Sequence, residues 1–82
     1  MAEIREDRLV DASGLSCPMP VVKAAKEMRA LAPGQVLKIV ATDHGSLADI
    51  PAWAEDTGNE LLETQNEAGR YVFLVRKGAP QT

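Results

Sequence analysis

The chain has 82 residues, with twelve acidic and nine basic side chains and a formal net charge of -3 at neutral pH. A globular domain usually needs about 100 residues, so this length provides for one domain without a deep interior cleft. The dispersed, slightly acidic charge offers no basic surface for a nucleic-acid backbone, and we expect no direct binding to DNA or RNA.

Residues 1–7 lack the apolar stretch of a signal peptide or membrane span, so we expect a cytoplasmic protein without membrane insertion. We expect a single domain over residues 1–82, with an ordered core at about 8–78 and short flexible termini. Cys17 is the single cysteine, which excludes an internal disulfide. Since no cysteine pair or histidine cluster offers zinc ligands, we expect no metal and no other cofactor.

The first half of the chain is predicted to form a strand, a helix and a second strand. Residues 9–12 are strand-like, and small residues then suit a turn. Apolar residues recur at helical spacing over 18–31, which predicts an amphipathic helix. Residues 36–41 are an apolar run of the kind found in strands covered by helices.

A second helix is predicted after the second strand. Ser46 with Asp49 three positions later resembles a capping box, and apolar residues including Trp53 then form one helical face. Pro51 leaves the start of this helix open, because a proline inside a helix removes a backbone hydrogen bond. Gly58 is a natural C-terminal cap.

Residues 60–65 and 70–76 are strand-like, and residues 66–69 have turn composition, which predicts a terminal hairpin. The element order is therefore βαβαββ. Right-handed crossovers place both helices on one face of a four-stranded mixed sheet, an α/β (α+β) two-layer sandwich. Both helices then start at the carboxyl edge of the sheet, so the loops 13–17 and 42–46 should be neighbours.

The tetrapeptide from Cys17 to Pro20 carries the predicted chemistry. Pro18 suits the first helical position, which would make Cys17 the N-cap. Pro18 and Pro20 together remove two of the four unpaired N–H groups of a helix start, which leaves those of Cys17 and Met19.

A helix start favours the thiolate, the reactive form of cysteine, whereas Asp43 in the neighbouring loop would oppose negative charge on sulfur. On balance we predict a modestly lowered pKa for Cys17. The alternative interpretation is an inert, buried cysteine beside prolines that merely begin a helix.

The segment from Val10 to Pro20 resembles the signature of the TusA (SirA-like) family of small sulfur-carrier proteins. Further similarity lies in Thr42-Asp43, Asp49-Ile50-Pro51 and Arg76-Lys77-Gly78. The resemblance covers nearly the whole chain. It implies a strand order of 1-2-4-3, with the fourth strand antiparallel to the others.

The resemblance also implies a sulfurtransferase in the carrier sense, with Cys17 as the catalytic residue. The Cys17 thiolate would take sulfane sulfur from a donor of the cysteine desulfurase or rhodanese type, become a transient persulfide, and pass the sulfur to an acceptor protein. The expected supporting residues are Gly14, Leu15, Pro18, Met19 and Pro20 of the motif, together with Asp43 and His44 in the loop that the topology places beside Cys17.

Two positions depart from relatives. His44 stands where many relatives have proline, and either assists an anionic sulfur or is simply solvated. Ala54 stands where some relatives have a second cysteine, so this chain has no resolving thiol there. Leu15 either contacts partners or plugs the end of the sandwich.

Lys23, Lys26 and Arg29 form a basic stretch on the first helix. It either orients an acidic partner or is an ordinary solvated helix face. A protein that docks successive partners is expected to be a monomer.

Two other functions stay open at this point. One is a non-catalytic regulatory or interaction module whose cysteine senses oxidation, and the other is haem or metal binding through the Cys-Pro dipeptide, for which one soft ligand is a weak basis. The sequence does not assign a pathway among tRNA thiolation, cofactor synthesis, sulfur oxidation and thiosulfate uptake.

Overall fold

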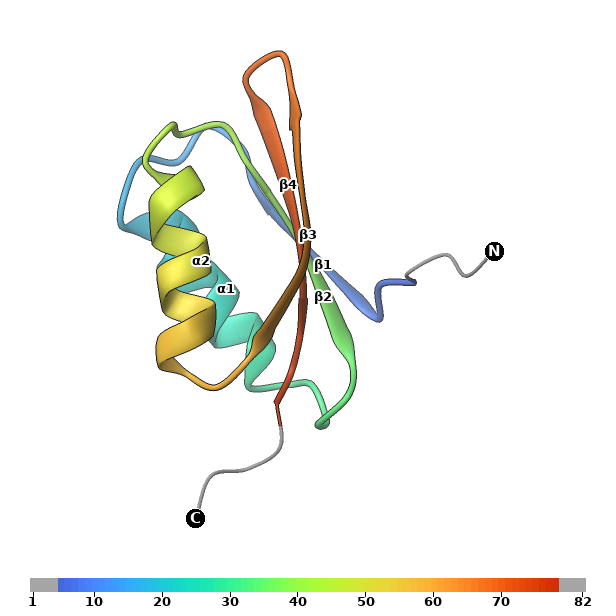
Figure 1. Cartoon of the computed structure of the whole chain (residues 1–82). Helices are drawn as coiled ribbons and strands as arrows, with labels where there is room; N and C mark the ends of the chain where they lie inside the picture. Colours follow the sequence, from blue (N-terminus) through green and yellow to red (C-terminus); the bar gives the residue numbers. More distant parts are fainter. Residues whose placement is uncertain (1–4, 79–82) are drawn as a thin grey trace.

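The computed structural model describes residues 5–78, and the expected flexible ends at 1–4 and 79–82 lie outside the described residues. Six elements follow one another along the chain (Figure 1). They are β1 (Arg8–Ala12), α1 (Met19–Met28), β2 (Val36–Ala41), α2 (Ser46–Asp56), β3 (Glu60–Glu67) and β4 (Arg70–Arg76).

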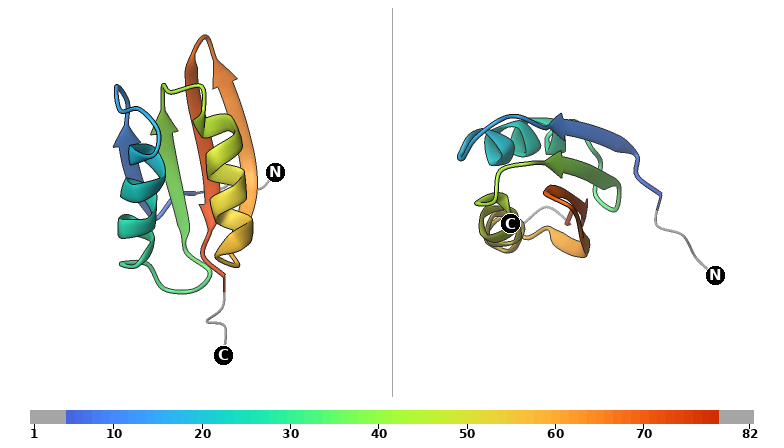
Figure 2. Two further views of the ribbon diagram at one scale, coloured as in Figure 1. Left: turned by 90° about the vertical axis from the view of Figure 1, so that its left-hand side faces the viewer. Right: turned by 90° about the horizontal axis from the view of Figure 1, so that it is seen from above.

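The four strands form one mixed sheet in the order β1-β2-β4-β3. β1 and β2 are parallel, whereas β4 is antiparallel to both of its neighbours. Both helices lie against the same face of this sheet, α1 in front of β1 and β2 and α2 in front of β4 (Figures 1 and 2). The two-layer sandwich and the implied strand order are therefore confirmed.

Most predicted boundaries are close to the observed ones, and β2 and β4 match residue for residue. The hairpin turn is tighter than predicted, because β3 continues to Glu67 and pairs it with Arg70. Ala68 and Gly69, with φ of 52° and 88°, make the two-residue connection. Positive φ at both turn positions matches the twist of the flanking strands, so the longer hairpin is favourable.

Neither helix has the N-cap that the sequence suggested. α1 starts at Met19, and Pro18 with φ -96° and ψ 12° is its N-cap, so the assignment of Cys17 as N-cap is wrong. α2 starts at Ser46 with Gly45 as N-cap and without a side-chain cap, so the capping box is also wrong. Pro51 lies inside α2, where the helix lacks one backbone hydrogen bond.

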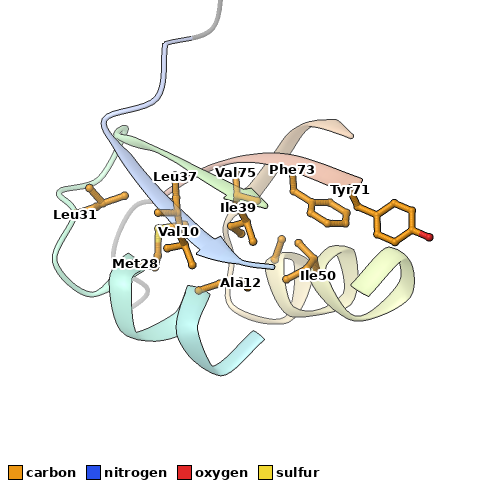
Figure 3. Packing of buried hydrophobic residues seen from close by; sticks show 12 residues of the cluster. Val10, Ala12, Met28, Leu31, Leu37, Ile39, Ile50, Tyr71, Phe73 and Val75 are labelled. Atoms are coloured by element: carbon orange, nitrogen blue, oxygen red, sulfur yellow. The ribbon is translucent and has the colours of Figure 1, made fainter. Parts of the chain in front are cut away.

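The core lies between the sheet and the two helices (Figure 3). Its largest fully buried side chains include Phe73, Leu37, Ile39 and Ile50, and the half-buried Trp53 packs against them as predicted. Hydrophobic burial thus fixes the helices on the sheet. It also fixes where the loops that precede the two helices meet.

Candidate functional site

The loops before α1 and α2 are joined by hydrogen bonds, as the topology predicts. The Gly14 N–H donates to Thr42 Oγ1 at 2.8 Å, and the Cys17 N–H donates to Asp43 Oδ2 at 3.3 Å. Gly14 has a φ of 79°, a conformation that favours glycine. These contacts hold the cysteine loop against the loop that follows β2.

Cys17 is a free and exposed cysteine at the end of the sandwich. The interpretation of Cys17 as a buried residue is therefore wrong. Pro20, two positions into α1, is by contrast fully buried and anchors the segment to the core. The sulfur is accessible while the chain that carries it is fixed.

Asp49 makes a contact that the sequence analysis did not foresee. The Cys17 Sγ–H donates to Asp49 Oδ2 at 2.7 Å. Asp49 lies in the first turn of α2, where an acidic residue also suits the helix dipole. The capping-box interpretation assigned this carboxylate to the helix itself, whereas it faces the thiol.

Gly45 is a second residue of the site that the sequence analysis missed. With φ -61° and ψ -22° its backbone has ordinary helical geometry and does not require glycine. A methyl group there would lie 3.0 Å from Asp43 Oδ2, and 3.7 Å from both Asp49 Oδ2 and Cys17 Cβ. The missing side chain therefore leaves the space in which the two carboxylates and the cysteine converge.

The pKa of the Cys17 thiol is raised, which makes the prediction of a lowered pKa wrong. The largest cause is the hydrogen bond to Asp49, followed by desolvation and by the negative charges of Asp49 and Asp43. The two N–H groups expected to stabilise a thiolate are engaged elsewhere: that of Cys17 by Asp43, and that of Met19 by the Ser16 carbonyl at 2.9 Å. The helix start thus supplies less positive charge to the sulfur than its position suggests.

His44 is exposed and lies in the loop beside Asp43. Its Nδ1 is 3.3 Å from the Tyr71 hydroxyl, and the two rings meet edge to face with centroids 6.2 Å apart. The described partner of His44 is therefore Tyr71, on β4, and the groups that contact Cys17 are carboxylates.

The surface beside Cys17 combines apolar and basic side chains. Met19 and Val22 are large apolar residues with exposed fractions of 45% and 50%. Lys23 and Lys26 are exposed on the same helix, and Arg29 is exposed at its C-cap. Leu15, in contrast, is half-buried and packs against the core.

Residues 5–78 contain neither a cluster of metal ligands nor a membrane-spanning helix. No group of three or more histidine, cysteine, aspartate or glutamate side chains is arranged to hold a metal ion there. No helix in this part of the chain has the length and hydropathy to cross a membrane.

The fold and the site define a small two-layer protein that presents one exposed cysteine on a hydrogen-bonded loop. The chain belongs to the TusA family: residues 8–77 match the family model described as sulfurtransferase TusA. It is 49% identical to the sulfur carrier protein TusA of Allochromatium vinosum over 71 residues, which cover 87% of this chain and 93% of the relative.

Two further similarities agree with this assignment. The chain is 51% identical over 70 residues to a putative sulfur carrier protein of Bacillus subtilis, YrkF, covering 85% of this chain and 38% of that protein. The crystal structure of a SirA-like protein from Desulfitobacterium hafniense superimposes with a TM-score of 0.70 at 28% identity, covering 88% of this chain and 99% of the other. The relatives' names identify the family as one of sulfur carriers.

Proposed function

We propose that this chain carries sulfane sulfur as a persulfide on Cys17 and passes it from a donor protein to an acceptor protein. The observation that carries the proposal is the exposed sulfur of Cys17 on a loop anchored by Pro20 and by the Asp43 contact. Membership of the TusA family supports it. Sulfur exchange between thiols requires an accessible sulfur atom and little else from the protein.

In the loading step the Cys17 sulfur attacks the outer sulfur of the donor's persulfide. A bond forms between Cys17 Sγ and that outer sulfur, and the donor's S–S bond breaks. The bonding electron pair stays on the donor's cysteine sulfur, which takes up the proton that Cys17 gives up. Unloading repeats the exchange with an acceptor thiolate, so the sulfane sulfur moves without any other oxidant or reductant.

The proposed donor is a persulfide-forming protein of the cysteine desulfurase or rhodanese type, and the acceptor is a second thiol protein. The carrier works as a monomer, because the same uncovered sulfur must meet each partner in turn. We place the relay in the cytoplasm, where thiols are kept reduced. A free cysteine is then available for sulfur rather than for a disulfide.

The side of α1 next to Cys17 is the proposed docking surface, defined as Met19, Val22, Lys23 and Lys26. Its apolar members give contact area and its lysines attract an acidic partner. Changing Lys23→Glu and Lys26→Glu together is expected to slow loading by an acidic donor roughly tenfold at low salt. Measuring the loading rate at several salt concentrations checks this, because the difference should shrink as salt screens the charges.

Arg5→Glu is the control for this experiment, since Arg5 precedes β1 whereas the cysteine loop follows it. It should leave the loading rate near that of the wild type. Equal loading rates for the wild type and the double variant at low salt would show that the lysines belong to an ordinary solvated helix face.

Intact-mass spectrometry tests the proposed function. After incubation with a cysteine desulfurase and L-cysteine, or with a rhodanese and thiosulfate, the wild-type protein should gain about 32 Da, the mass of one sulfur atom. Dithiothreitol should remove this mass. Oxidation to a sulfinic acid adds about the same mass but withstands thiols, so a gain that persists, or no gain with either donor, would contradict the proposal.

A further inference from the structure

The contact between Cys17 and Asp49 has a consequence for when the carrier reacts. Thiolate is the nucleophilic form of cysteine, whereas the Cys17 thiol keeps its proton and donates a hydrogen bond to Asp49 Oδ2 at 2.7 Å. A carboxylate accepts this hydrogen bond from a thiol and repels a thiolate in the same place. The observed geometry is therefore specific for the protonated sulfur.

We propose that Asp49 keeps Cys17 in the unreactive thiol form while the carrier is free in solution. This inference rests on the proposed function for its biological meaning, because a carrier that meets several proteins must not react with every electrophile or oxidant on the way. It rests on the contact itself for its chemistry. Asp49 touches the reacting atom, so its effect does not depend on an intermediate residue.

The charges that act on the Cys17 sulfur are the carboxylates of Asp49 and Asp43. Asp43 Oδ2 accepts a hydrogen bond from the Cys17 N–H at 3.3 Å, whereas Asp49 Oδ2 accepts one from the Cys17 thiol. Of the basic groups nearby, His44 faces Tyr71 through Nδ1, and Lys23 Nζ lies 3.4 Å from the Asp11 carbonyl oxygen. Asp49 is therefore the carboxylate that accepts the hydrogen bond of the thiol, and Asp43 adds a weaker repulsion of negative charge on the sulfur.

Gly45 is a second structural indication that the contact between Asp49 and Cys17 is a specific feature of the site. Its backbone conformation is open to any residue, yet a side chain there would press on Asp43 and contact both Asp49 and Cys17. The space for the two carboxylates beside the sulfur thus depends on a glycine that the backbone does not need.

The pH dependence of Cys17 alkylation by iodoacetamide tests this inference without any sulfur donor. In Asp49→Asn and Asp49→Ala the carboxylate is gone, so the reactivity profile should move to lower pH and alkylation at pH 7 should accelerate about threefold or more. Both variants are needed because asparagine can also donate a hydrogen bond to a thiolate, whereas alanine removes the carboxylate without supplying a donor. Asp56→Asn, at the other end of α2, is the matched control and should keep the wild-type profile.

A profile that stays in place in both Asp49 variants, or moves to higher pH, would overturn the role of Asp49. The same would follow if Asp56→Asn moved the profile as far as Asp49→Asn does. Alkylation needs no persulfide, so this result is independent of sulfur loading. Failure of loading in the wild type would refute the proposed function and leave the Asp49 measurement valid.

Discussion

Cys17→Ser is expected to abolish sulfur loading completely. Cys17 is the single cysteine of the chain, and a serine hydroxyl does not form a persulfide. Because the side chain is exposed, the variant should keep the wild-type circular dichroism spectrum and melting temperature. Intact mass after incubation with the donor is the measurement. A gain of about 32 Da in the folded variant would show that sulfur binds elsewhere.

A relocated thiol shows whether position matters as well as chemistry. Ser16 is exposed and immediately precedes Cys17, so Ser16→Cys combined with Cys17→Ser moves the thiol by one residue. The relocated sulfur loses the Asp49 contact, which alone would speed its reaction, but it also leaves its fixed place beside α1, and we expect the loss of position to dominate. We expect it to load roughly tenfold more slowly than the wild type, because exchange depends on which sulfur the partner can reach. Equal loading would indicate that any exposed thiol on this domain serves.

Phe73→Ala is expected to cause the largest loss of stability. Phe73 is fully buried in β4 and packs in the cluster between sheet and helices (Figure 3). Emptying such a site costs about 3–5 kcal/mol, whereas a domain of this size has a total stability of about 4–12 kcal/mol. Urea denaturation should therefore show a midpoint far below that of the wild type.

Two companion variants make the stability measurement specific. Phe73→Leu keeps most of the buried volume and should lose less stability than the alanine variant. Val22→Ala alters a side chain with an exposed fraction of 50% and should leave the denaturation midpoint unchanged. A loss below about 1 kcal/mol for Phe73→Ala would contradict the observed core.

The fold followed from the sequence to a large degree because its signals are local and redundant. Two strand-like runs, two helical patterns and a hairpin composition are enough to define βαβαββ, and handedness then places both helices on one face. The strand order came from the family resemblance. The end of α1 at Met28 is earlier than predicted and the end of β3 at Glu67 is later. At the helix starts, Pro18 and Gly45 hold N-cap positions that sequence rules give to residues with capping side chains.

The site was predicted only in part, because its charge balance depends on contacts across two loops. The topology brought Asp43 to Cys17 correctly. Asp49 was noted within a familiar triplet but interpreted as a helix cap, since spacing within one helix says nothing about a thiol 32 positions away in sequence. Gly45 gave no signal, because a glycine required for space looks like any loop glycine.

Helix-dipole reasoning gave the wrong sign for the pKa of Cys17 for the same reason. It took the N–H groups of Cys17 and Met19 to be free, whereas Asp43 and Ser16 accept them. It also left out the Asp49 carboxylate, which accepts the hydrogen bond of the thiol. Sequence can locate a reactive atom more easily than it can assign that atom's protonation.

Cyanide treatment of the loaded and desalted protein tests most directly whether Cys17 holds transferable sulfur. Cyanide attacks the outer sulfur of a persulfide, forms thiocyanate and releases the cysteine thiolate. We predict about one equivalent of thiocyanate per chain and a return to the unloaded mass, with none from Cys17→Ser. A mass gain that persists while no thiocyanate forms would contradict the account.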